Sequence, residues 1–377
     1  MAQRVLRTAT IVGARPQFVK MAPVLRAMRE ARLTVVDQVI HTGQHYDDAL
    51  SRIFFAELEL PAPQVNLGVG SATAGRQTAR MLEAIETELR ATDPQVVIVY
   101  GDTNSTLAGA LAAAKLHIPV AHVEAGLRSF NRQMPEELNR IVTDHVAELL
   151  LAPTQTAVQN LATEGLAART RLTGDVMYDA VLQHARRALA ESRALERLDL
   201  APGSYGLLTI HRAENTTARD LVPLLHAVTA AARRFGPLIF PLHPRTAGVL
   251  GTLNPPWKAP AELLLIEPQG YLDMLALLMG ARCVLTDSGG LQKEAYFVNC
   301  PCITLRNETE WLETLGTGAN QLAGADGAAL AQLLERLQDA SPRAYSQAPV
   351  AIAGPFGGGD AARRVVEALC DLAEVQS

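Results

Sequence analysis

The sequence predicts an α/β protein built from two Rossmann-like, doubly wound domains with a cleft between them. Short apolar runs alternate with longer helix-like segments, a pattern typical of parallel sheets covered by helices on both faces. The alternation is interrupted by a polar stretch at residues 186–203 and then starts again. A chain of 377 residues that is 48% hydrophobic is also long enough to bury two cores.

The first half alternates from its beginning. Residues 95–100 (QVVIVY) form a continuous apolar run, as expected of a central parallel strand that is buried on both faces. Residues 106–115 are rich in Ala and Leu and predict a helix. The strands expected in this half are 7–12, 35–41, 95–100, 120–123 and 149–152, and the helices are 22–31, 106–115 and 137–145.

The second half repeats the same pattern. We therefore expect an N-terminal domain over residues 1–174 and a C-terminal domain over residues 175–359. The strands expected here are 205–210, 237–242, 263–267, 283–286 and 302–305, and the helices are 221–235, 273–279 and 289–297.

The chain ends with a predicted amphipathic helix at residues 361–375, for which Asp360 is a suitable N-cap. The preceding glycines would either form a hinge, so that the segment 360–377 returns to the N-terminal domain, or make a simple surface turn.

Composition excludes several classes of partner. The net charge is −5 and no long basic block is present, so we expect no nucleic-acid partner. No apolar run reaches the roughly 18 residues of a membrane span, and the N-terminal apolar run resembles a first strand rather than a signal peptide. We expect a cytoplasmic protein without a membrane partner. The four cysteines lack zinc or redox spacing and are expected to be ordinary thiols.

Polar residues directly after strands are the candidates for function, because ligands of open α/β sheets bind beyond the carboxyl ends of the strands. Arg15 and Lys20 follow the first strand and open a helix, where they would either contact an anion such as phosphate or be solvated surface residues. No GxGxxG fingerprint follows any strand, so neither NAD nor FAD is expected. Gln44 lies in a polar segment, 41–47, which we expect to line the cleft or to serve a structural role rather than to bind a metal.

Three carboxylates follow strands or lie soon after them. Asp102 comes directly after the run 95–100, where it would either act chemically or cap the next helix. Glu124 also stands at a strand end, and capping explains it poorly because Glu is not a favoured N-cap. Glu136 and Glu137 follow Pro135 at a predicted helix start, and the helix dipole is a sufficient structural reason for one of them. Arg140 lies nearby and would tune these acids or bind anionic groups.

The second half offers a phosphate site. His211, Arg212 and Asn215 follow one strand, and His243 follows the next. A histidine there donates to a phosphate or transfers a proton near neutral pH. Ser288, Gly289 and Gly290 open a helix whose amides suit a diphosphate, with Glu294 one turn on for a vicinal diol such as ribose. Arg306, after the following strand, is a further ligand candidate.

Taken together, these segments resemble the non-hydrolysing UDP-N-acetylglucosamine 2-epimerases. The resemblance covers nearly the whole chain and runs in the same order. The segments that carry it are GARPQFVKMAP, HTGQHYD, YGDTNSTLAGALAA, HVEAGLRS, PEELNR, GDVMYDA, IHRAEN, TDSGGLQKEA, ITLRNETE and PFGGGDAARR. The chain departs from the common pattern at Gln17, in QHYDD, in HRAEN and at Gly358. QHYDD puts allosteric activation by the substrate in doubt.

The resemblance implies two Rossmann-like domains in a glycosyltransferase-B arrangement, a homodimer, a UDP-sugar substrate and no cofactor. It also implies catalytic roles and UDP contacts. The implied catalytic residues are Asp102, Glu124 and Glu136, with His211 near the diphosphate, and the implied UDP contacts are Arg15, Lys20, His211, Ser288, Gly289, Gly290, Glu294 and Arg306.

The chemistry expected of such an enzyme is an elimination. The C2 proton of a hexosamine is not next to a carbonyl, so UDP would leave C1 while a base takes that proton, and UDP would then add back. Convergent acids of tuned pKa suit this task. UDP-N-acetylglucosamine is the expected substrate, and a UDP-2,3-diacetamido-2,3-dideoxyglucuronate is the alternative. A hydrolysing epimerase, a glycosyltransferase and a non-catalytic UDP-sugar sensor are competing hypotheses.

Overall fold

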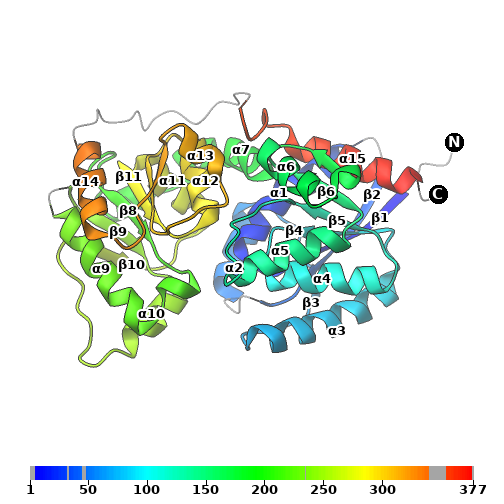
Figure 1. Ribbon diagram of the computed structural model, residues 1–377, viewed down its shortest axis with the longest axis horizontal. Coiled ribbons are helices and arrows are strands. Elements are labelled where there is room, and N and C mark those ends of the chain that lie inside the picture. The colour runs from blue at the N-terminus through cyan, green and yellow to red at the C-terminus, as the bar shows by residue number, and fades with distance from the viewer. Residues whose placement is uncertain (1–4, 32–33, 45–47, 234, 339–353, 376–377) are drawn as a thin grey trace. The chain divides into compact units, whose positions relative to one another are not determined.

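The computed structural model describes residues 5–31, 34–44, 48–233, 235–338 and 354–375. Contacts divide the chain into two compact units (Figure 1). Unit 1 contains Met1–Ala180 and Ala351–Ser377, and unit 2 contains Val181–Val350. Each unit is an α/β structure around one parallel sheet, so the predicted fold class is confirmed.

Unit 1 is built on a parallel sheet that, in its described part, has seven strands in the order β3-β2-β1-β4-β5-β6-β7. The chain winds outward from β1 in both directions, which is the doubly wound pattern. The central strands β1 and β4 are largely buried because helices cover both faces of the sheet. Helix α4 approaches β1 closely, since an added Cβ at Gly109 would lie 3.1 Å from the Ile11 side chain. The strands are β1 Val5–Val12, β2 Thr34–His41, β3 Val65–Asn66, β4 Val96–Tyr100, β5 Val120–Val123, β6 Leu149–Ala152 and β7 Thr170–Leu172.

The helices of unit 1 follow its strands in sequence. Neighbouring helices α3, α4 and α5 pack side by side, and α15 packs against α1 (Figure 1). The helices are α1 Arg15–Glu30, α2 Asp48–Glu57, α3 Ala74–Thr92, α4 Asn104–Lys115, α5 Pro135–Val146, α6 Gln155–Thr163, the 3-10 turn η1 Ala167–Arg169, α7 Val176–Glu191 and α15 Ala361–Val375.

Unit 2 repeats the plan with a parallel sheet in the order β10-β9-β8-β11-β12-β13 over its described residues. Its core lies between the sheet and helices such as α9 and α14, with Leu225, Phe240 and Leu330 fully enclosed. The elements are α8 Ala194–Arg197, β8 Gly206–Thr209, η2 Ala213–Asn215, α9 Ala218–Ala232, β9 Leu238–Pro241, α10 Pro244–Gly251, β10 Leu263–Ile266, α11 Tyr271–Gly280, β11 Cys283–Thr286, α12 Gly289–Phe297, β12 Cys302–Thr304, α13 Leu312–Gly316, β13 Asn320–Leu322 and α14 Gly327–Gln338.

Several helices differ from the sequence prediction, and α1 and α3 are the clearest cases. Helix α1 begins at Arg15 rather than at residue 22, because Pro near its start fits a first helical turn and the Gln17 side chain accepts the free N–H groups of Gly13 and Ala14. Helix α3 was not predicted at all. It buries only a narrow stripe at four-residue spacing, Gln77, Met81, Ile85 and Leu89, and most of its other residues are polar or alanine.

The C-terminal helix is joined to α7 by polar contacts. The carboxylate of Asp179 in α7 accepts a hydrogen bond of 2.7 Å from the backbone N–H of Ala362. The side chain of Asp360 instead bonds to Arg363 and Arg364, so the expected cap by Asp360 is supplied by Asp179. The contacts of the chain place the division between the units inside α7, at Ala180 and Val181.

Among the described residues, no helix combines the length and the apolar character that crossing a membrane requires.

Candidate active site

The loop after β1 is packed tightly against the neighbouring loops of unit 1. An added Cβ at Gly13 would lie 2.0 Å from Thr42 Oγ1 and 2.3 Å from Ser105 Oγ, so only glycine fits. The buried Gln17 amide donates to the Tyr100 carbonyl oxygen at 3.0 Å, which ties this loop to the end of β4. The carboxyl ends of β1 and β4 are thereby fixed to one another.

Two cations of α1 stand at this edge of the sheet. Arg15 is half-buried at the first position of the helix, and its guanidinium lies 6.0 Å from the centre of the Phe54 ring. Lys20 is buried one turn further on and forms a direct ion pair with Glu124. The positive end of a helix dipole and a cation together favour a bound anion, which is the role predicted for Arg15.

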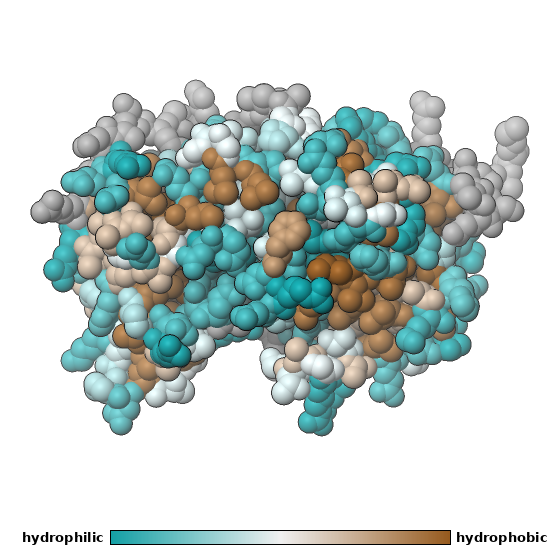
Figure 2. Space-filling view, in the orientation of Figure 1, coloured by the Kyte–Doolittle hydropathy of each residue, from teal (hydrophilic) through white to brown (hydrophobic). Residues whose placement is uncertain are grey.

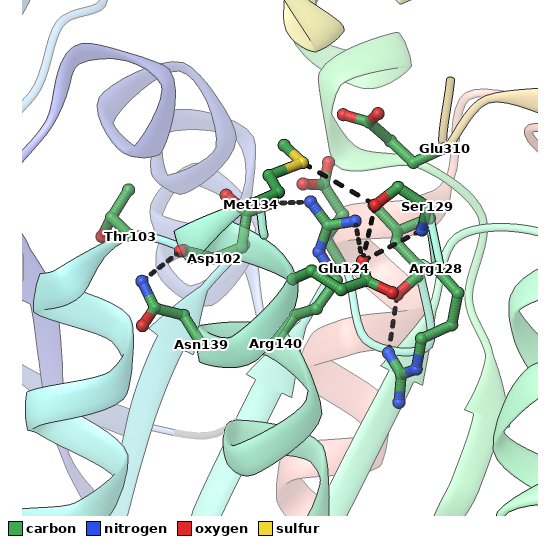
Figure 3. Close-up of polar contacts among 12 residues, drawn as sticks. Asp102, Thr103, Glu124, Arg128, Ser129, Met134, Asn139, Arg140 and Glu310 are labelled. Atoms are coloured by element: carbon green, nitrogen blue, oxygen red, sulfur yellow. Dashed lines mark hydrogen bonds and ion pairs between the residues drawn. The ribbon is translucent and has the colours of Figure 1, made fainter. Parts of the chain in front are cut away.

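Asp102 is held from two sides by α5, as Figure 3 shows. Arg140 Nη2 lies 2.5 Å from Asp102 Oδ2, and the Asn139 amide donates to the Asp102 carbonyl oxygen at 2.9 Å. The side chain of Asp102 keeps 23% of its surface exposed. Thr103, not Asp102, is the N-cap of α4, so helix capping does not explain Asp102.

Arg140 itself is almost completely enclosed, with 1% of its side chain exposed. It joins Asp102 to Glu137, whose Oε2 lies 2.9 Å from Arg140 Nη1. Glu137 also accepts hydrogen bonds from the backbone N–H groups of Ser129 and Phe130, both at 2.9 Å. Within the protein, Arg140 therefore orients the Asp102 carboxylate.

The two adjacent glutamates at the start of α5 differ in environment. Glu137 is buried and holds the loop that precedes the helix, whereas Glu136 is half-buried in the first turn. The sequence indicated that one of these acids is structural without saying which, and the structure assigns that role to Glu137. Glu136 stays the predicted catalytic residue of the two.

Glu124 follows β5 in a left-handed backbone conformation, with φ of 72°. Residues other than glycine rarely adopt this conformation, and it costs about 1–3 kcal/mol where the surroundings enforce it. The Glu124 carboxylate is only 5% exposed and faces the Lys20 ammonium. A buried cation thus fixes this acid, as Arg140 fixes Asp102.

Gln44 lies at the end of the loop after β2, with His45–Asp47 outside the described residues. Its side-chain oxygen accepts hydrogen bonds from the Ser105 N–H at 3.1 Å and the Ser105 hydroxyl at 2.7 Å. His41 Nδ1 accepts the Gly43 N–H at 3.0 Å. Within the described chain, no group of three or more His, Cys, Asp or Glu side chains is placed to hold a metal ion.

In unit 2, the loop after β8 is organised by Asp287, which follows β11 and is fully buried. Its carboxylate accepts hydrogen bonds from the backbone N–H groups of His211 and Arg212 at 3.0 and 2.9 Å, and from the Asn215 amide at 3.1 Å. Asn215 therefore shapes the loop that presents the half-buried His211. This role of Asp287 could not be predicted from the sequence, because its partners lie more than 70 residues away.

His211 lies beside His243, with their ring centres 5.4 Å apart. The His243 ring accepts the backbone N–H of Arg245 at 3.2 Å and so caps α10. Arg245 in turn donates to the His211 carbonyl oxygen at 3.2 Å. Both predicted histidines thus belong to one group at the carboxyl ends of β8 and β9.

The N-terminus of α12 is where the sequence predicts an anion site. Ser288 caps the helix, and an added Cβ at Gly289 would lie 2.4 Å from Glu310 Oε1, so the backbone there is closely approached. Glu294, on the same helix, lies near the hydroxyl of Tyr271. Burial raises the pKa of Tyr271 well above its ordinary value, and the nearby Glu294 carboxylate raises it further.

Arg306 belongs to a cluster of charges that the sequence did not reveal in full. It is 2% exposed and pairs with Glu310 at 3.0 Å, and Arg212 Nη2 lies 3.6 Å from the other oxygen of Glu310. Glu214 and Glu308 each lie 3.8 Å from Arg306. Glu310 was missed because its partner Arg212 is distant in sequence and its burial depends on the fold.

The two units thus contain different chemistry. Unit 1 presents carboxylates held by buried cations at strand ends, and unit 2 presents a histidine pair, a capped helix N-terminus and arginines. Two Rossmann-like units with these groups define a nucleotide-sugar enzyme of the glycosyltransferase-B class. Residues 27–370 match the family model of UDP-N-acetylglucosamine 2-epimerase, and the chain belongs to that family. The predicted family is confirmed, and its members are isomerases.

Several relatives match over nearly their whole length. The chain is 45% identical to a UDP-N-acetylglucosamine 2-epimerase homolog of Methanococcus maripaludis, with 97% of this chain and 100% of the relative covered. It is 43% identical to the UDP-2,3-diacetamido-2,3-dideoxy-D-glucuronate 2-epimerase of Pseudomonas aeruginosa, with the same coverage. The crystal structure of the Methanocaldococcus jannaschii UDP-GlcNAc 2-epimerase in complex with UDP-GlcNAc and UDP is 40% identical and superposes with a TM-score of 0.89, over 97% of this chain and 100% of that chain.

Proposed function

We propose that this enzyme inverts C2 of UDP-N-acetylglucosamine to give UDP-N-acetylmannosamine, by eliminating UDP and adding it back. The observation that supports this proposal most directly is the pair of acids at the ends of adjacent strands β4 and β5. Asp102 is held by Arg140 and Glu124 by Lys20, so both carboxylates are fixed in place before any substrate binds. Acids fixed in this way suit proton transfer at one carbon from two sides.

The first step breaks two bonds of the sugar. A carboxylate takes the proton from C2, the C2–H electrons form the C1=C2 bond, and the C1–O bond breaks with its electrons leaving on UDP. The product is a 2-acetamidoglucal. In the return step an acid delivers a proton to the opposite face of C2 while a diphosphate oxygen bonds to C1, so atoms and charge balance and no oxidant is needed.

Asp102 and Glu124 are the proposed proton-transfer groups, and Glu136 is a further acid–base or positioning group. Arg140, with Asn139, keeps Asp102 in place. The side-chain exposure of 23% at Asp102, against 5% at Glu124, leaves Asp102 more open to an incoming sugar. Gln44 is proposed to contact the substrate next to the loop of Ser105.

UDP is the proposed ligand of the unit 2 groups. The dipole of α12, whose N-terminus carries Ser288, Gly289 and Gly290, favours the diphosphate, and Glu294 suits the ribose diol. His211 would stabilise the leaving diphosphate by hydrogen bonding. Arg212, Asn215, His243 and Arg306 complete the proposed set in unit 2. The family resemblance implies Arg15 and Lys20 as further UDP contacts.

Solvent deuterium tests the mechanism. In heavy water the elimination route should place deuterium at C2 of both epimers, which NMR of the recovered UDP-sugars detects. A product without deuterium at C2 would refute elimination. The same spectra separate a hydrolysing enzyme, which would release UDP and free N-acetylmannosamine, and a glycosyltransferase would give no C2 epimer.

Asp102→Asn tests the assignment of the acid. The variant keeps the shape of the side chain and should lose at least about 100-fold in kcat, as expected for removing a general acid or base. Its affinity for UDP, measured by calorimetry, should stay within about twofold of wild type. Near-normal turnover would exclude Asp102 from proton transfer.

A second substrate is favoured by one specific observation. The identity to the Pseudomonas aeruginosa UDP-2,3-diacetamido-2,3-dideoxy-D-glucuronate 2-epimerase is 43%, and the identity to the Methanocaldococcus jannaschii UDP-N-acetylglucosamine 2-epimerase is 41%. We therefore propose the diacetamido uronate as the alternative substrate. Comparing kcat/KM on both UDP-sugars decides between them, because the true substrate should exceed the other by a factor of 100 or more.

We also propose that the enzyme is a homodimer. Phe130, Leu138 and Val142, in α5 and the loop before it, are 75%, 41% and 39% exposed, and Figure 2 shows apolar surface gathered over α4 and α5 of unit 1. Such a patch fits burial against a second copy. Light scattering with Leu138→Glu tests this, because a shift from dimer to monomer is expected and an unchanged mass would exclude this face.

The proposed setting of the enzyme is the cytoplasm, where its product would feed synthesis of cell-surface polysaccharide. The cysteines Cys283, Cys300, Cys302 and Cys370 are free thiols, which suits a reducing compartment.

A further inference from the structure

His122 of β5 is completely buried behind the strand ends that bear the acids. Its Nε2 lies 2.7 Å from the carbonyl oxygen of Gly101, and its Nδ1 lies 2.7 Å from Asp144 Oδ1. Neither residue is a substrate group in the proposed function. The position of His122 nevertheless connects it directly to the residue before Asp102.

The two contacts determine how many protons the ring holds. A carbonyl oxygen only accepts hydrogen bonds, so Nε2 must donate to Gly101. An ionised carboxylate also only accepts, so Nδ1 must donate to Asp144. Neutral histidine has a single N–H, and both donations together require the imidazolium cation.

The surroundings of Asp144 favour its ionised form. Its Oδ2 lies 2.8 Å from Arg128 Nη1 and accepts the Gly126 N–H at 3.2 Å. Burial alone would raise the pKa of Asp144, but His122 and Arg128 outweigh burial and hold the pKa below its ordinary value.

The charges around Asp144 also favour a protonated His122. Arg128 forms a two-bond pair with Glu164, both at 2.7 Å, in addition to its contact with Asp144. Glu164 is 27% exposed and has His145 Nδ1 as a further neighbour at 3.8 Å. Arg128 is thus shared between two carboxylates, and a protonated His122 adds a second positive charge beside the fully buried Asp144, where solvent is excluded.

This network holds both loops that bear the proposed acids. The Gly101 carbonyl accepts from His122 and its N–H donates to the Val123 carbonyl at 3.0 Å, so the peptide before Asp102 is fixed on both sides. Gly101 has φ of 63°, and an added Cβ would lie 2.8 Å from Lys20 Nζ. On the other loop, Asp144 holds the N–H of Gly126, two residues after Glu124.

We propose that His122 is a positioning residue that carries a proton on both ring nitrogens in the folded protein, is paired with Asp144, and fixes the backbone of the Asp102 and Glu124 loops relative to each other. The catalytic part of this inference rests on the proposed function of those acids. The protonation of His122 in the free protein does not.

Two variants separate the two hydrogen bonds. In His122→Asn the amide nitrogen replaces Nδ1, so a donor to Asp144 remains and the donor to Gly101 is lost. In His122→Gln the amide nitrogen replaces Nε2, so the donor to Gly101 remains. We expect kcat to fall about 10- to 100-fold in His122→Asn with KM changed less than about threefold, because small displacements of a reacting group cost up to about 100-fold. His122→Gln should recover part of that loss.

His117→Gln is the matched control, because His117 is exposed in the loop before β5, and its kcat should stay within about twofold. Thermal unfolding of each variant shows whether it is folded. Equal kcat in His122→Asn and wild type, or a rise in KM with kcat unchanged, would overturn the positioning role.

NMR of the wild-type protein labelled with ¹⁵N in histidine tests the protonation directly and needs no variant activity. At pH 8, both ring nitrogens of His122 should carry a proton, as its two hydrogen bonds require. The missing signals in His122→Gln assign the residue. A neutral tautomer at pH 8 would overturn the inference, whereas full activity of Asp102→Asn would overturn the proposed function and leave this NMR result unaffected.

Discussion

Replacing Arg140 with Met removes the buried cation that joins two acids of unit 1. The Arg140 and Glu137 side chains are each 1% exposed, and that of Asp102 is 23% exposed. Removing one partner of a buried ion pair costs about 3–5 kcal/mol, because the other charge stays buried without compensation. Of the two acids, only Glu137 is buried enough for the full cost to apply.

Glu137 keeps three hydrogen bonds in the variant, from the N–H and hydroxyl of Ser129 and from the N–H of Phe130. These bonds continue to stabilise the carboxylate, so the loss should lie near the lower limit. We expect the free energy of unfolding to fall by about 3 kcal/mol. Loss of the contact to Asp102 should also lower kcat by about 100-fold, since the acid is no longer held in one orientation.

Urea unfolding followed by circular dichroism measures the change in stability. The matched control is Arg90→Met, which breaks an exposed pair with Glu86 on α3 and should change stability by less than about 0.5 kcal/mol. The double variant Arg140→Met, Glu137→Gln has no uncompensated charge. Its loss of unfolding free energy should therefore be smaller than the sum of the losses in the two single variants.

A loss below about 1 kcal/mol in Arg140→Met would refute the argument, because it would mean that the buried Glu137 carboxylate does not depend on this cation. Strictly additive effects in the double variant would refute it as well.

Two further predictions follow from single side chains. Gly289→Ala should weaken UDP binding at least about 10-fold in calorimetry, since its Cβ would lie 2.4 Å from Glu310 Oε1, whereas Gly248→Ala, with open space around it, should bind normally. Burial, opposed by the Thr8 and Thr10 hydrogen bonds, raises the pKa of Asp37 from 3.8 to about 6. An acid with a raised pKa holds its proton more tightly when folded, so its contribution to stability is full below about pH 4 and is lost as the pH rises to about 6. Asp37→Asn should therefore gain up to about 3 kcal/mol relative to wild type between pH 4 and pH 7, and a difference independent of pH would contradict this.

The fold could be predicted from the sequence where a segment's own pattern specifies its structure. The runs that became β5, β6 and β11 were predicted with the observed bounds, because continuous apolar residues in short segments leave few alternatives. Helix α12 and helix α15 were also predicted with their observed bounds. Helix α3 escaped prediction because its narrow apolar stripe is sparse among polar residues.

Local sequence pattern predicted only part of the candidate site. Asp102, Glu124, His211 and Ser288 stand directly after strands, and a parallel sheet brings the carboxyl ends of its strands to one edge. The partners of these residues were not predictable. Lys20 and Glu124 are 104 residues apart, and His211 and Asp287 are 76 apart.

The sequence alone therefore determined the class of fold, the family and the strand ends where polar side chains gather, because these depend on local pattern and on motifs. Only the tertiary structure decided which charges compensate each other and which acids are structural. It distinguished Glu137 from Glu136, gave Arg140 two buried partners and placed His122 between Gly101 and Asp144. The physical reason is that the energy of a charge depends on its burial and on the few atoms around it, and both depend on how distant segments pack together.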